Sequence, residues 1–320
     1  MSMRFDLEFL PMVSTAAGVL AGLDLKHRCI VVDHLTIGRV NPAQWDQVFL
    51  LAAETTFKIR PEMEMIGDKL VVIATSKEPG LTRWPYVFFP HWLTMIKPSL
   101  RPSIEERKNE FFYDALLGRA KDPRTRLLQE LEKLNLLGQG MISYCPGGFY
   151  GPNINLDAST YYNSIWEYED QEIRDIYGTD LNYNLVKDST IRTLDGYFSS
   201  CRIPTKVYAR SAVSLVAETD NIGDHVFVTE KTWKPMIAGR IAVIYATPAH
   251  EDFLEELGFW FPSKTRGDPA KAAKAMEDLY LNTDPMQASR RIETIQNRRL
   301  ADPQRWISML YSWLDRNVRN

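Results

Sequence analysis

The stretch from residue 226 to residue 245 constrains the fold more than any other part of this sequence. It begins with the β-prone run Val226–Val228, continues with a polar turn, and then predicts a helix over residues 232–238. Gly239 is expected to end that helix, and the apolar run Ile241–Tyr245 is expected to form a buried parallel strand. This order predicts a βαβ unit, and ligands of such units bind at the carboxyl ends of the strands.

The polar turn of this unit places an acid and a base side by side where the helix should begin. Thr229 and Glu230 suit a helix N-terminus, where backbone N–H groups point outward and attract anions. Lys231 adds a compact positive charge that can meet a phosphate. The pattern therefore favours a site for an anionic ligand, and the alternative is a surface Glu-Lys pair at an ordinary helix start.

A second βαβ unit is predicted upstream of the first. Residues 110–113 (Glu-Phe-Phe-Tyr) predict a strand, the leucine-rich stretch 127–137 predicts an amphipathic helix, and residues 141–144 predict the next strand. Asp122 is the expected N-cap of this helix, with Pro123 at its first position, and Gly138 is expected to end it.

Four cations crowd the predicted start of that helix. Positive charges at a helix N-terminus oppose the helix dipole, which is unfavourable unless an anion lies among them. The crowding therefore predicts a phosphate site, and a solvated basic loop is the alternative. The four residues are Arg119, Lys121, Arg124 and Arg126.

The segment Phe227-Val-Thr-Glu-Lys231, followed by a small-residue helix and an apolar strand, resembles the donor-binding motif of the α1,3-fucosyltransferases. The pattern TEK-W-KP in this chain is also similar to a version of the motif in glycosyltransferase-like proteins of phages and marine bacteria. Phe227 stands where the family has Tyr, and Trp233-Lys234 stands where it has Tyr-Asn. The resemblance extends over about residues 106–260.

This resemblance implies a donor site for a sugar nucleotide. It implies that Glu230 contacts the ribose and that Lys231 contacts the pyrophosphate. It also implies a phosphate-binding arginine before the upstream helix, for which Arg124 and Arg126 are both candidates. Glu218, at the end of the strand before the motif, becomes a candidate partner for a nucleoside or sugar hydroxyl, and an ordinary loop acid is the alternative.

The N-terminal part of the chain predicts an open α/β sheet from four short apolar runs, each of which ends in polar or aromatic residues. An inverting sugar transfer needs a general base near the acceptor hydroxyl, and loops after these strands are its expected source. Asp33 and Glu54 are the candidates, favoured over His34 because the bases of the resembling family are carboxylates. The four runs are Ile30–Val32, Val48–Ala52, Leu70–Ala74 and Tyr86–Phe89.

The predicted fold class is α/β, with two Rossmann-like domains facing each other in the GT-B manner. Residues 1–104 form the predicted acceptor-side domain, and residues 105–300 form the predicted sugar-nucleotide-binding domain. Residues 301–320 are expected to form a C-terminal helix that packs back on the first domain. Phe259–Phe261 is expected to be the last strand of the second sheet.

Composition excludes several other classes. The net charge of −3 argues against a non-specific nucleic-acid coat, and the three cysteines show no CxxC spacing. We find no signal peptide and no apolar run near the roughly 18 residues of a membrane span, so we expect a cytoplasmic protein of a bacterium or a phage-infected host, without a membrane partner. The sequence contains no D-x-D motif and no His/Cys set with metal spacing, so we expect a metal-independent transfer without a cofactor.

The predicted function is transfer of a hexose or pentose from a UDP- or GDP-sugar to an acceptor hydroxyl of a glycan, a protein or a hydroxymethylated DNA base. A DNA acceptor predicts a basic face on the first domain, whereas a saccharide acceptor predicts aromatic platforms, for which Trp84, Trp92 and Phe149 are candidates. The alternatives are a non-catalytic nucleotide- or sugar-binding module on the same fold, and a scaffold that binds no ligand.

Overall fold

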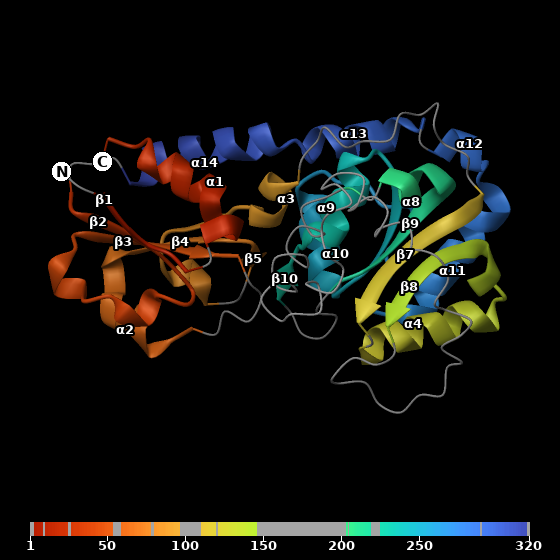
Figure 1. Cartoon of the computed structure of the whole chain (residues 1–320), viewed down its shortest axis with the longest axis horizontal. Helices are drawn as coiled ribbons and strands as arrows, with labels where there is room; N and C mark the ends of the chain where they lie inside the picture. The colour runs from red at the N-terminus through yellow and green to blue at the C-terminus, as the bar shows by residue number, and fades with distance from the viewer. Residues whose placement is uncertain are drawn as a thin grey trace, which may run out of the picture. The chain divides into compact units, whose positions relative to one another are not determined.

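The computed structural model describes residues 3–8, 10–24, 27–53, 59–77, 80–96, 110–119, 121–145, 203, 205–218, 225–288 and 290–318. The chain divides into two compact units (Figure 1). The first unit comprises Met1–Met95, Asp224–Thr229 and Ala301–Asn320, and the second comprises Ile96–Gly223 and Glu230–Leu300. A short segment and the C-terminal helix therefore rejoin the first unit after the chain has entered the second.

A parallel sheet of five strands, in the order β1-β2-β3-β4-β6, forms the centre of the first unit. All four predicted apolar runs are strands of this sheet, so that prediction is confirmed. Every residue of β2 and β4 is buried, which explains why these runs are continuously apolar rather than alternating. The strands are β1 (Met3–Asp6), β2 (Cys29–Asp33), β3 (Gln47–Ala52), β4 (Leu70–Ala74) and β6 (Tyr86–Phe88).

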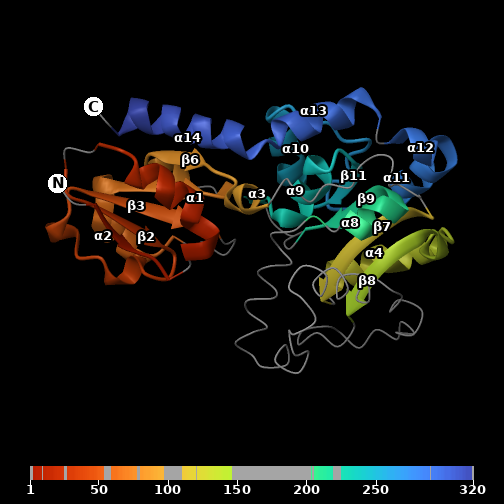
Figure 2. The ribbon, with the colours of Figure 1, turned by 45° about the horizontal axis from the view of Figure 1, so that its top comes forward.

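Helices cover both faces of this sheet (Figure 2). One face packs on α1 (Leu10–Ala21), α3 (His91–Met95) and α14 (Pro303–Asn317), and Trp306 of α14 meets the ring of Phe88 edge-on at 5.6 Å. The other face, formed by alternate strand residues, packs on side chains from α2 (Pro61–Ile66) and its neighbouring turns. The prediction that the C-terminal helix packs on the first domain is therefore confirmed.

The second unit is built on a parallel sheet of four strands in the order β11-β9-β7-β8. The predicted units around residues 110–144 and 226–245 both contribute to it. Its strands are β7 (Phe111–Arg119), β8 (Gly140–Cys145), β9 (Ser211–Ala217) and β11 (Ile241–Tyr245). Its helices are α4 (Asp122–Lys133), α8 (Thr205–Arg210), α9 (Glu230–Ile237), α10 (Pro248–Glu256), α11 (Pro269–Asn282), α12 (Pro285–Ala288) and α13 (Ile292–Leu300).

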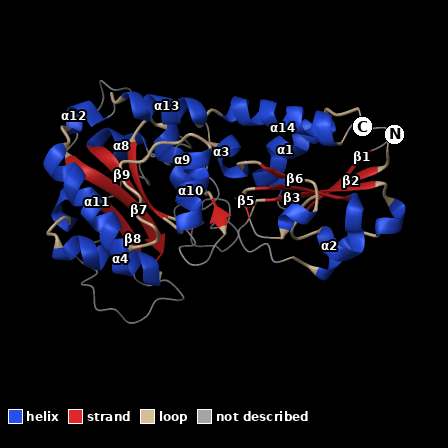
Figure 3. Cartoon of the chain, turned by 180° about the vertical axis from the view of Figure 1, so that it is seen from behind, coloured by secondary structure: helices blue, strands red, loops and turns tan. Residues whose placement is uncertain are grey.

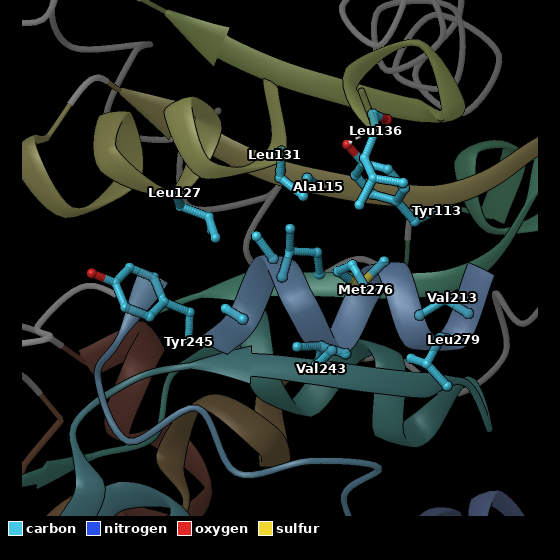
Figure 4. Close-up of a cluster of buried hydrophobic side chains, with 14 of the residues drawn as sticks. Tyr113, Ala115, Leu127, Leu131, Leu136, Val213, Val243, Tyr245, Met276 and Leu279 are labelled. Atoms are coloured by element: carbon cyan, nitrogen blue, oxygen red, sulfur yellow. Dashed lines mark hydrogen bonds between the residues drawn. The ribbon is translucent and has the colours of Figure 1, made fainter. Parts of the chain in front are cut away.

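Alternate residues of these strands point to opposite faces of the second sheet. Odd-numbered residues such as Val213 and Val243 join the leucines of α4 and the alanines and Met276 of α11 in one apolar core (Figure 4). The other face lies against α9, on the opposite side from α4 and α11 (Figure 3). The sheet is thus covered by helices on both sides, as the α/β class requires.

The upstream helix begins and ends earlier than predicted. Lys121, not Asp122, is the N-cap of α4, and no side chain caps this end. Asn135, with φ 55°, takes the left-handed position that was predicted for Gly138. The N–H groups of Asn135 and Leu136 bond to the carbonyls of Glu132 and Leu131, which closes the helix in a Schellman motif. Asparagine tolerates this conformation because its short polar side chain bonds locally.

The helix of the central motif starts two residues before the predicted position, at Glu230. Gly239, with φ 67°, ends it as predicted, and the N–H groups of Gly239 and Arg240 bond to the carbonyls of Met236 and Pro235. The structure corrects the prediction that residues 226–228 form the first parallel strand of this βαβ unit. Residues 226–227 form β10 (Val226–Phe227), which pairs antiparallel with β5 (Ser76–Lys77) of the first unit, whereas the parallel neighbour of β11 is β9.

Arg240 is a buried cation that the sequence analysis missed. Its side chain has no solvent exposure and pairs with Asp114 of β7 at 2.6 Å. It also donates to the hydroxyls of Ser211 and Ser214, and to the carbonyls of Tyr208, Ser211 and Val213. Burial raises the pKa of Asp114, and the Arg240 charge and the two serine hydroxyls oppose that shift. One guanidinium therefore holds β7, β9 and α8 together.

Phe259–Phe261 is not a strand, which corrects another prediction. The side-chain amide of Asn297 on α13 instead satisfies the backbone there. Its oxygen accepts from the N–H of Trp260 at 2.8 Å, and its nitrogen donates to the carbonyl of Trp260 at 2.7 Å. A single side chain thus replaces the hydrogen bonds that a neighbouring strand would supply.

We predict that Gly140→Ala destabilises the second unit. A Cβ at Gly140 would lie 2.2 Å from Cζ of Tyr113, its partner across the β7–β8 ladder. Tyr113 is fully buried, so the ring can move only by disturbing the core, and we expect a loss of about 1–3 kcal/mol in the free energy of unfolding. Urea denaturation measures this loss. Gly138→Ala is the matched control, because a Cβ there meets nothing within 4 Å, and a stable Gly140→Ala variant would contradict the prediction.

We also predict that Arg240→Met destabilises the protein by about 3–5 kcal/mol, because it leaves the carboxylate of Asp114 buried without its counter-charge. Arg126→Met, which removes an exposed ion pair with Asp122, should change the free energy of unfolding by less than about 1 kcal/mol. The double variant Arg240→Met/Asp114→Leu should lose less than the sum of the two single variants. Strict additivity in chemical denaturation would show that the pair is not coupled.

Candidate functional site

The order of strands in the second sheet marks where a ligand would bind. From β7 the chain crosses to β8 on one side, and β9 and β11 lie on the other side, so the order reverses between β7 and β9. Ligands of open parallel sheets bind at the carboxyl edge beside such a reversal. The β7–β9 ladder reaches only as far as Asp114 and Ser214, although both strands continue beyond these residues. The carboxyl ends of β7 and β9 therefore continue without a shared ladder at this point.

Glu230 and Lys231 lie in the first turn of α9, the helix that follows β10. The ammonium of Lys231 donates to Oε1 of Glu230 at 2.8 Å, and the Lys231 side chain keeps 24% of its surface exposed. Burial alone would raise the pKa of Glu230. The charges of Lys231 and Lys234 and hydrogen bonds to the carboxylate outweigh burial, so the pKa of Glu230 lies below its ordinary value. The motif thus presents a buried, ionised carboxylate beside a partly exposed ammonium.

Glu218 directly follows β9 and is buried at the same edge. Its carboxylate accepts from the hydroxyl of Thr232 at 2.6 Å, and its backbone N–H bonds to the carbonyl of Tyr245 at the end of β11. The structure therefore brings Glu218 together with the first turn of α9. Thr229, by contrast, is buried and belongs with the first unit, so the unit boundary falls between Thr229 and Glu230.

The two candidate arginines of α4 lie in different environments. Arg124 is buried, with 5% of its surface exposed. Arg126 is exposed and pairs with Asp122 one turn earlier at 2.9 Å. This pair relieves part of the crowding of positive charge at the helix start. Because α4 directly follows β7, and Thr232 in the first turn of α9 bonds to Glu218 at the end of β9, the candidate cations belong to helices that begin at the same edge of one sheet. Their convergence on one diphosphate stays a prediction.

Asp33 occupies the turn after β2 in the first unit. It is fully buried, and its Oδ1 accepts from the N–H of Leu35 at 2.9 Å, from the N–H of Thr36 at 3.0 Å and from the hydroxyl of Thr36 at 3.1 Å. The carboxylate therefore holds the turn. Next to it, burial lowers the pKa of His34, Asp33 opposes the shift and Arg60 adds to it. The other candidate base, Glu54, lies outside the described residues.

The aromatic candidates for an acceptor platform differ in their surroundings. Trp84 is buried in the core of the first unit under the guanidinium of Arg83, so its ring is not a surface platform. Trp92 is partly buried, and its indole N–H donates to the carbonyl of Ala53, just after β3, at 3.0 Å. Phe149 lies outside the described residues.

His91 is a buried titratable group that sequence reasoning did not find. It follows β6, and its Nε2 lies 3.2 Å from the carbonyl of Ile73, which fixes Nε2 as the protonated nitrogen of the neutral ring. Its Nδ1 is buried without a hydrogen-bond partner among the described residues. Burial lowers the pKa of His91 to about 4, partly opposed by the bond to Ile73. No pattern in the sequence distinguishes this histidine from a surface one.

Comparison with known proteins adds no argument about the fold or the function of this chain. No protein-family model and no curated protein matches the chain. Among solved structures, it is similar to the DNA-modifying enzyme β-glucosyltransferase, determined with and without uridine diphosphoglucose, at 10% identity and a TM-score of 0.47, covering 98% of this chain and 100% of the other. A likeness this distant carries no argument about function, and the α/β class rests on the two parallel sheets. The resemblance to fucosyltransferases stays a prediction.

Two further searches of the described residues bear on ligands. No helix there is long and apolar enough to cross a bilayer. No group of three or more His, Cys, Asp or Glu side chains is arranged there to hold a metal ion. The predicted independence from metal remains an expectation from the sequence.

The buried histidine predicts a pH dependence of stability. The pKa of His91 is about 4 in the folded protein and ordinarily 6.5, so the unfolded chain binds a proton more readily between these values. The neutral His91 side chain contributes about 3 kcal/mol to the free energy of unfolding. This contribution is complete above about pH 6.5 and is lost as the pH falls toward 4. Urea unfolding near pH 7.5 and near pH 4.5 measures the loss.

His91→Gln should remove most of this pH-dependent loss, since a neutral side chain takes up no proton in that range. His34→Gln is the control and should retain most of it, because His34 is less buried. Equal pH dependence in the wild type and in His91→Gln would contradict the assignment.

Proposed function

We propose that this protein is a glycosyltransferase that takes its sugar from a nucleotide-sugar donor bound at the carboxyl edge of the second sheet. The observation that carries the proposal is the reversal of strand order between β7 and β9. Helices α4 and α9 begin beside this reversal and carry Arg124 and the Glu230–Lys231 pair. Such a reversal flanked by helix N-termini suits a ligand with phosphate groups.

In this proposal the donor is a UDP- or GDP-sugar, and each group at the edge has one task. Glu230 accepts hydrogen bonds from the ribose, and its lowered pKa keeps it ionised for that task. Lys231 holds the pyrophosphate and, together with Arg124 or Arg126, stabilises the charge that develops on the leaving diphosphate. Glu218 accepts a hydrogen bond from a hydroxyl of the nucleoside or sugar. Thr229 stabilises the turn before the helix.

The acceptor in this proposal brings a hydroxyl group to the first unit. A carboxylate there, Asp33 or Glu54, takes the hydroxyl proton as general base. The three hydrogen bonds at Oδ1 of Asp33 and its full burial favour Glu54 of the two. Acidic and basic side chains of the first unit are nearly equal in number, so a glycan or protein acceptor has more support than hydroxymethylated DNA.

The second candidate function is a nucleotide- or sugar-binding module without catalysis. The engagement of Asp33 in its own turn favours this alternative, because it leaves the first unit with one fewer candidate base. Both functions share the donor site and differ only in turnover. Release of UDP or GDP from a nucleotide sugar, followed over time with and without acceptors, separates them.

We predict that UDP or GDP raises the melting temperature of the protein. A ligand at about 100 times its dissociation constant adds roughly 2.7 kcal/mol to the free energy of unfolding, which shifts the melting temperature by several degrees in a protein of this size. Lys231→Met should weaken binding about tenfold or more, since it removes a charge from the phosphate site. Differential scanning fluorimetry with UDP, GDP, ADP and CMP tests this.

Lys271→Met is the matched control, because Lys271 also lies in the first turn of a helix of the same unit, α11, but away from the reversal of strand order. Its melting temperature should respond to nucleotides as the wild type does. If no nucleotide shifts the wild-type melting temperature, the donor site is not where we propose it. If nucleotides shift the melting temperatures of Lys271→Met and Lys231→Met equally, Lys231 does not take part in nucleotide binding.

A further inference from the structure

Helix α13 buries polar residues and exposes apolar ones, the reverse of an ordinary surface helix. Its buried residues are the polar Thr294 and Asn297. Its isoleucines face outward, with Ile292 77% exposed and Ile295 39% exposed. A surface helix normally buries its apolar stripe and exposes its polar one. Ile292 therefore contributes little to the stability of the folded unit, and its exposure calls for another explanation.

Polar contacts to Trp260 hold the inner face of α13. Asn297 binds both backbone groups of Trp260, and the guanidinium of Arg291, just before the helix, lies 4.9 Å from the centre of the Trp260 ring. The hydroxyl of Thr294 donates to the carbonyl of Arg291 at 2.8 Å, a bond within the start of the helix. None of these contacts uses Ile292. The helix lies at the outer rim of the second unit in all three ribbon views (Figures 1, 2 and 3).

Positive charge surrounds the exposed isoleucines. Arg290, Arg298 and Arg299 are exposed and form no ion pair within the part of the chain that the structure describes. The one acid of this helix, Glu293, is already paired with Arg291 at 3.5 Å. The stem of Arg298 also approaches the backbone of Gly239, so its position is partly structural. This is a local excess of positive charge in a chain of net charge −3.

The helical repeat brings these side chains onto one surface. Residues three and four apart share a face of a helix, so Ile292, Ile295 and Arg299 form one outward stripe, with Arg298 beside Ile295. Arg290 is exposed two residues before the helix begins. We call these five residues the α13 patch. Exposed apolar side chains with arginines near them suit the interface of an anionic bilayer, where the arginines meet headgroups and the apolar groups meet acyl chains.

We infer that the α13 patch docks the protein on an anionic lipid surface. Guanidinium groups pair with lipid phosphates in bidentate fashion, and the isoleucines enter the boundary between headgroups and acyl chains. A nucleic-acid backbone would satisfy the arginines in the same way but would leave Ile292 and Ile295 in water, so the isoleucines favour lipid. This contact is peripheral and does not depend on the proposed transferase activity.

The test is co-sedimentation of the full chain with vesicles. Wild type should bind vesicles of mixed phosphatidylcholine and phosphatidylglycerol, should not bind phosphatidylcholine alone, and should dissociate as salt is raised. Arg290→Gln/Arg299→Gln should lower partitioning about thirtyfold, since each arginine near an anionic surface is worth roughly fivefold. Ile292→Ser/Ile295→Ser should lower it about tenfold.

Lys271→Gln removes one exposed charge from α11 and serves as the control, which should partition like the wild type. Thermal unfolding verifies that the variants remain folded, as their exposed positions lead us to expect. Absence of binding to anionic vesicles at low salt would overturn the inference, as would binding that the patch variants do not reduce. Tighter binding to a DNA duplex that needs the arginines but not the isoleucines would also overturn it, in favour of nucleic acid.

Discussion

The buried guanidinium of Arg240 is the interaction on which the second unit depends. It pairs with Asp114 on β7 and bonds to Ser214 on β9, and these two residues are paired in the ladder between the two strands. An arginine this deeply buried is tolerated only when nearly all its N–H groups are bonded, which is the case here. Parallel pairing between β7 and β9 thus ends where this cluster ends. The position of the candidate site follows from that point, because both strands continue toward the carboxyl edge beyond it.

Local features of this fold were predictable from the sequence, and long-range partners were not. Apolar runs such as Leu70–Ala74 predict buried parallel strands because both of their faces are covered. Gly239 predicts a helix end because it takes a left-handed conformation without steric strain. Which strand pairs with which is a different matter. Residues 226–227 have ordinary β propensity, and only tertiary context joins them to β5 rather than to β11.

Most of the wrong predictions involve polar residues that have structural roles. Asn297 replaces a strand beside Trp260, and Asn135 takes the place predicted for Gly138 at a helix end. Both depend on hydrogen bonds between residues whose spacing in the chain follows no period, so periodicity cannot find them. Arg240 looks like an ordinary surface cation in the sequence, since its partner Asp114 lies 126 residues away. For the candidate site, the place of Glu230 and Lys231 at the start of a helix was predictable, whereas the hydrogen bond from Thr232 to Glu218 was not.

The first turn of α9 raises an electrostatic question for the proposed donor site. A helix N-terminus favours anions, but this one already holds the carboxylate of Glu230, which lies 2.8 Å from the ammonium of Lys231. A diphosphate would therefore meet a cation whose charge is partly compensated. An ammonium carries three donors, so it can hold a carboxylate and a phosphate oxygen together. The compensation weakens the attraction for free phosphate and favours a ligand that also satisfies Glu230, such as a nucleotide with ribose hydroxyls.

Strand order also distinguishes the carboxyl edges of the two sheets. In the first unit, the described strands follow one another across the sheet without a reversal, so the order itself opens no crevice. Described polar groups at its carboxyl edge, such as Asp33 and Thr75, bond to the backbone of nearby turns. Asp33 holds the turn after β2, and the hydroxyl of Thr75 joins the carbonyl of Phe89 to the N–H of His91. In the second unit, the strand order reverses between β7 and β9, and at that edge Glu218 bonds to Thr232 and Glu230 to Lys231. For the acceptor that we propose at the first unit, the order of the described strands favours a site on the loops over one in a crevice of the sheet.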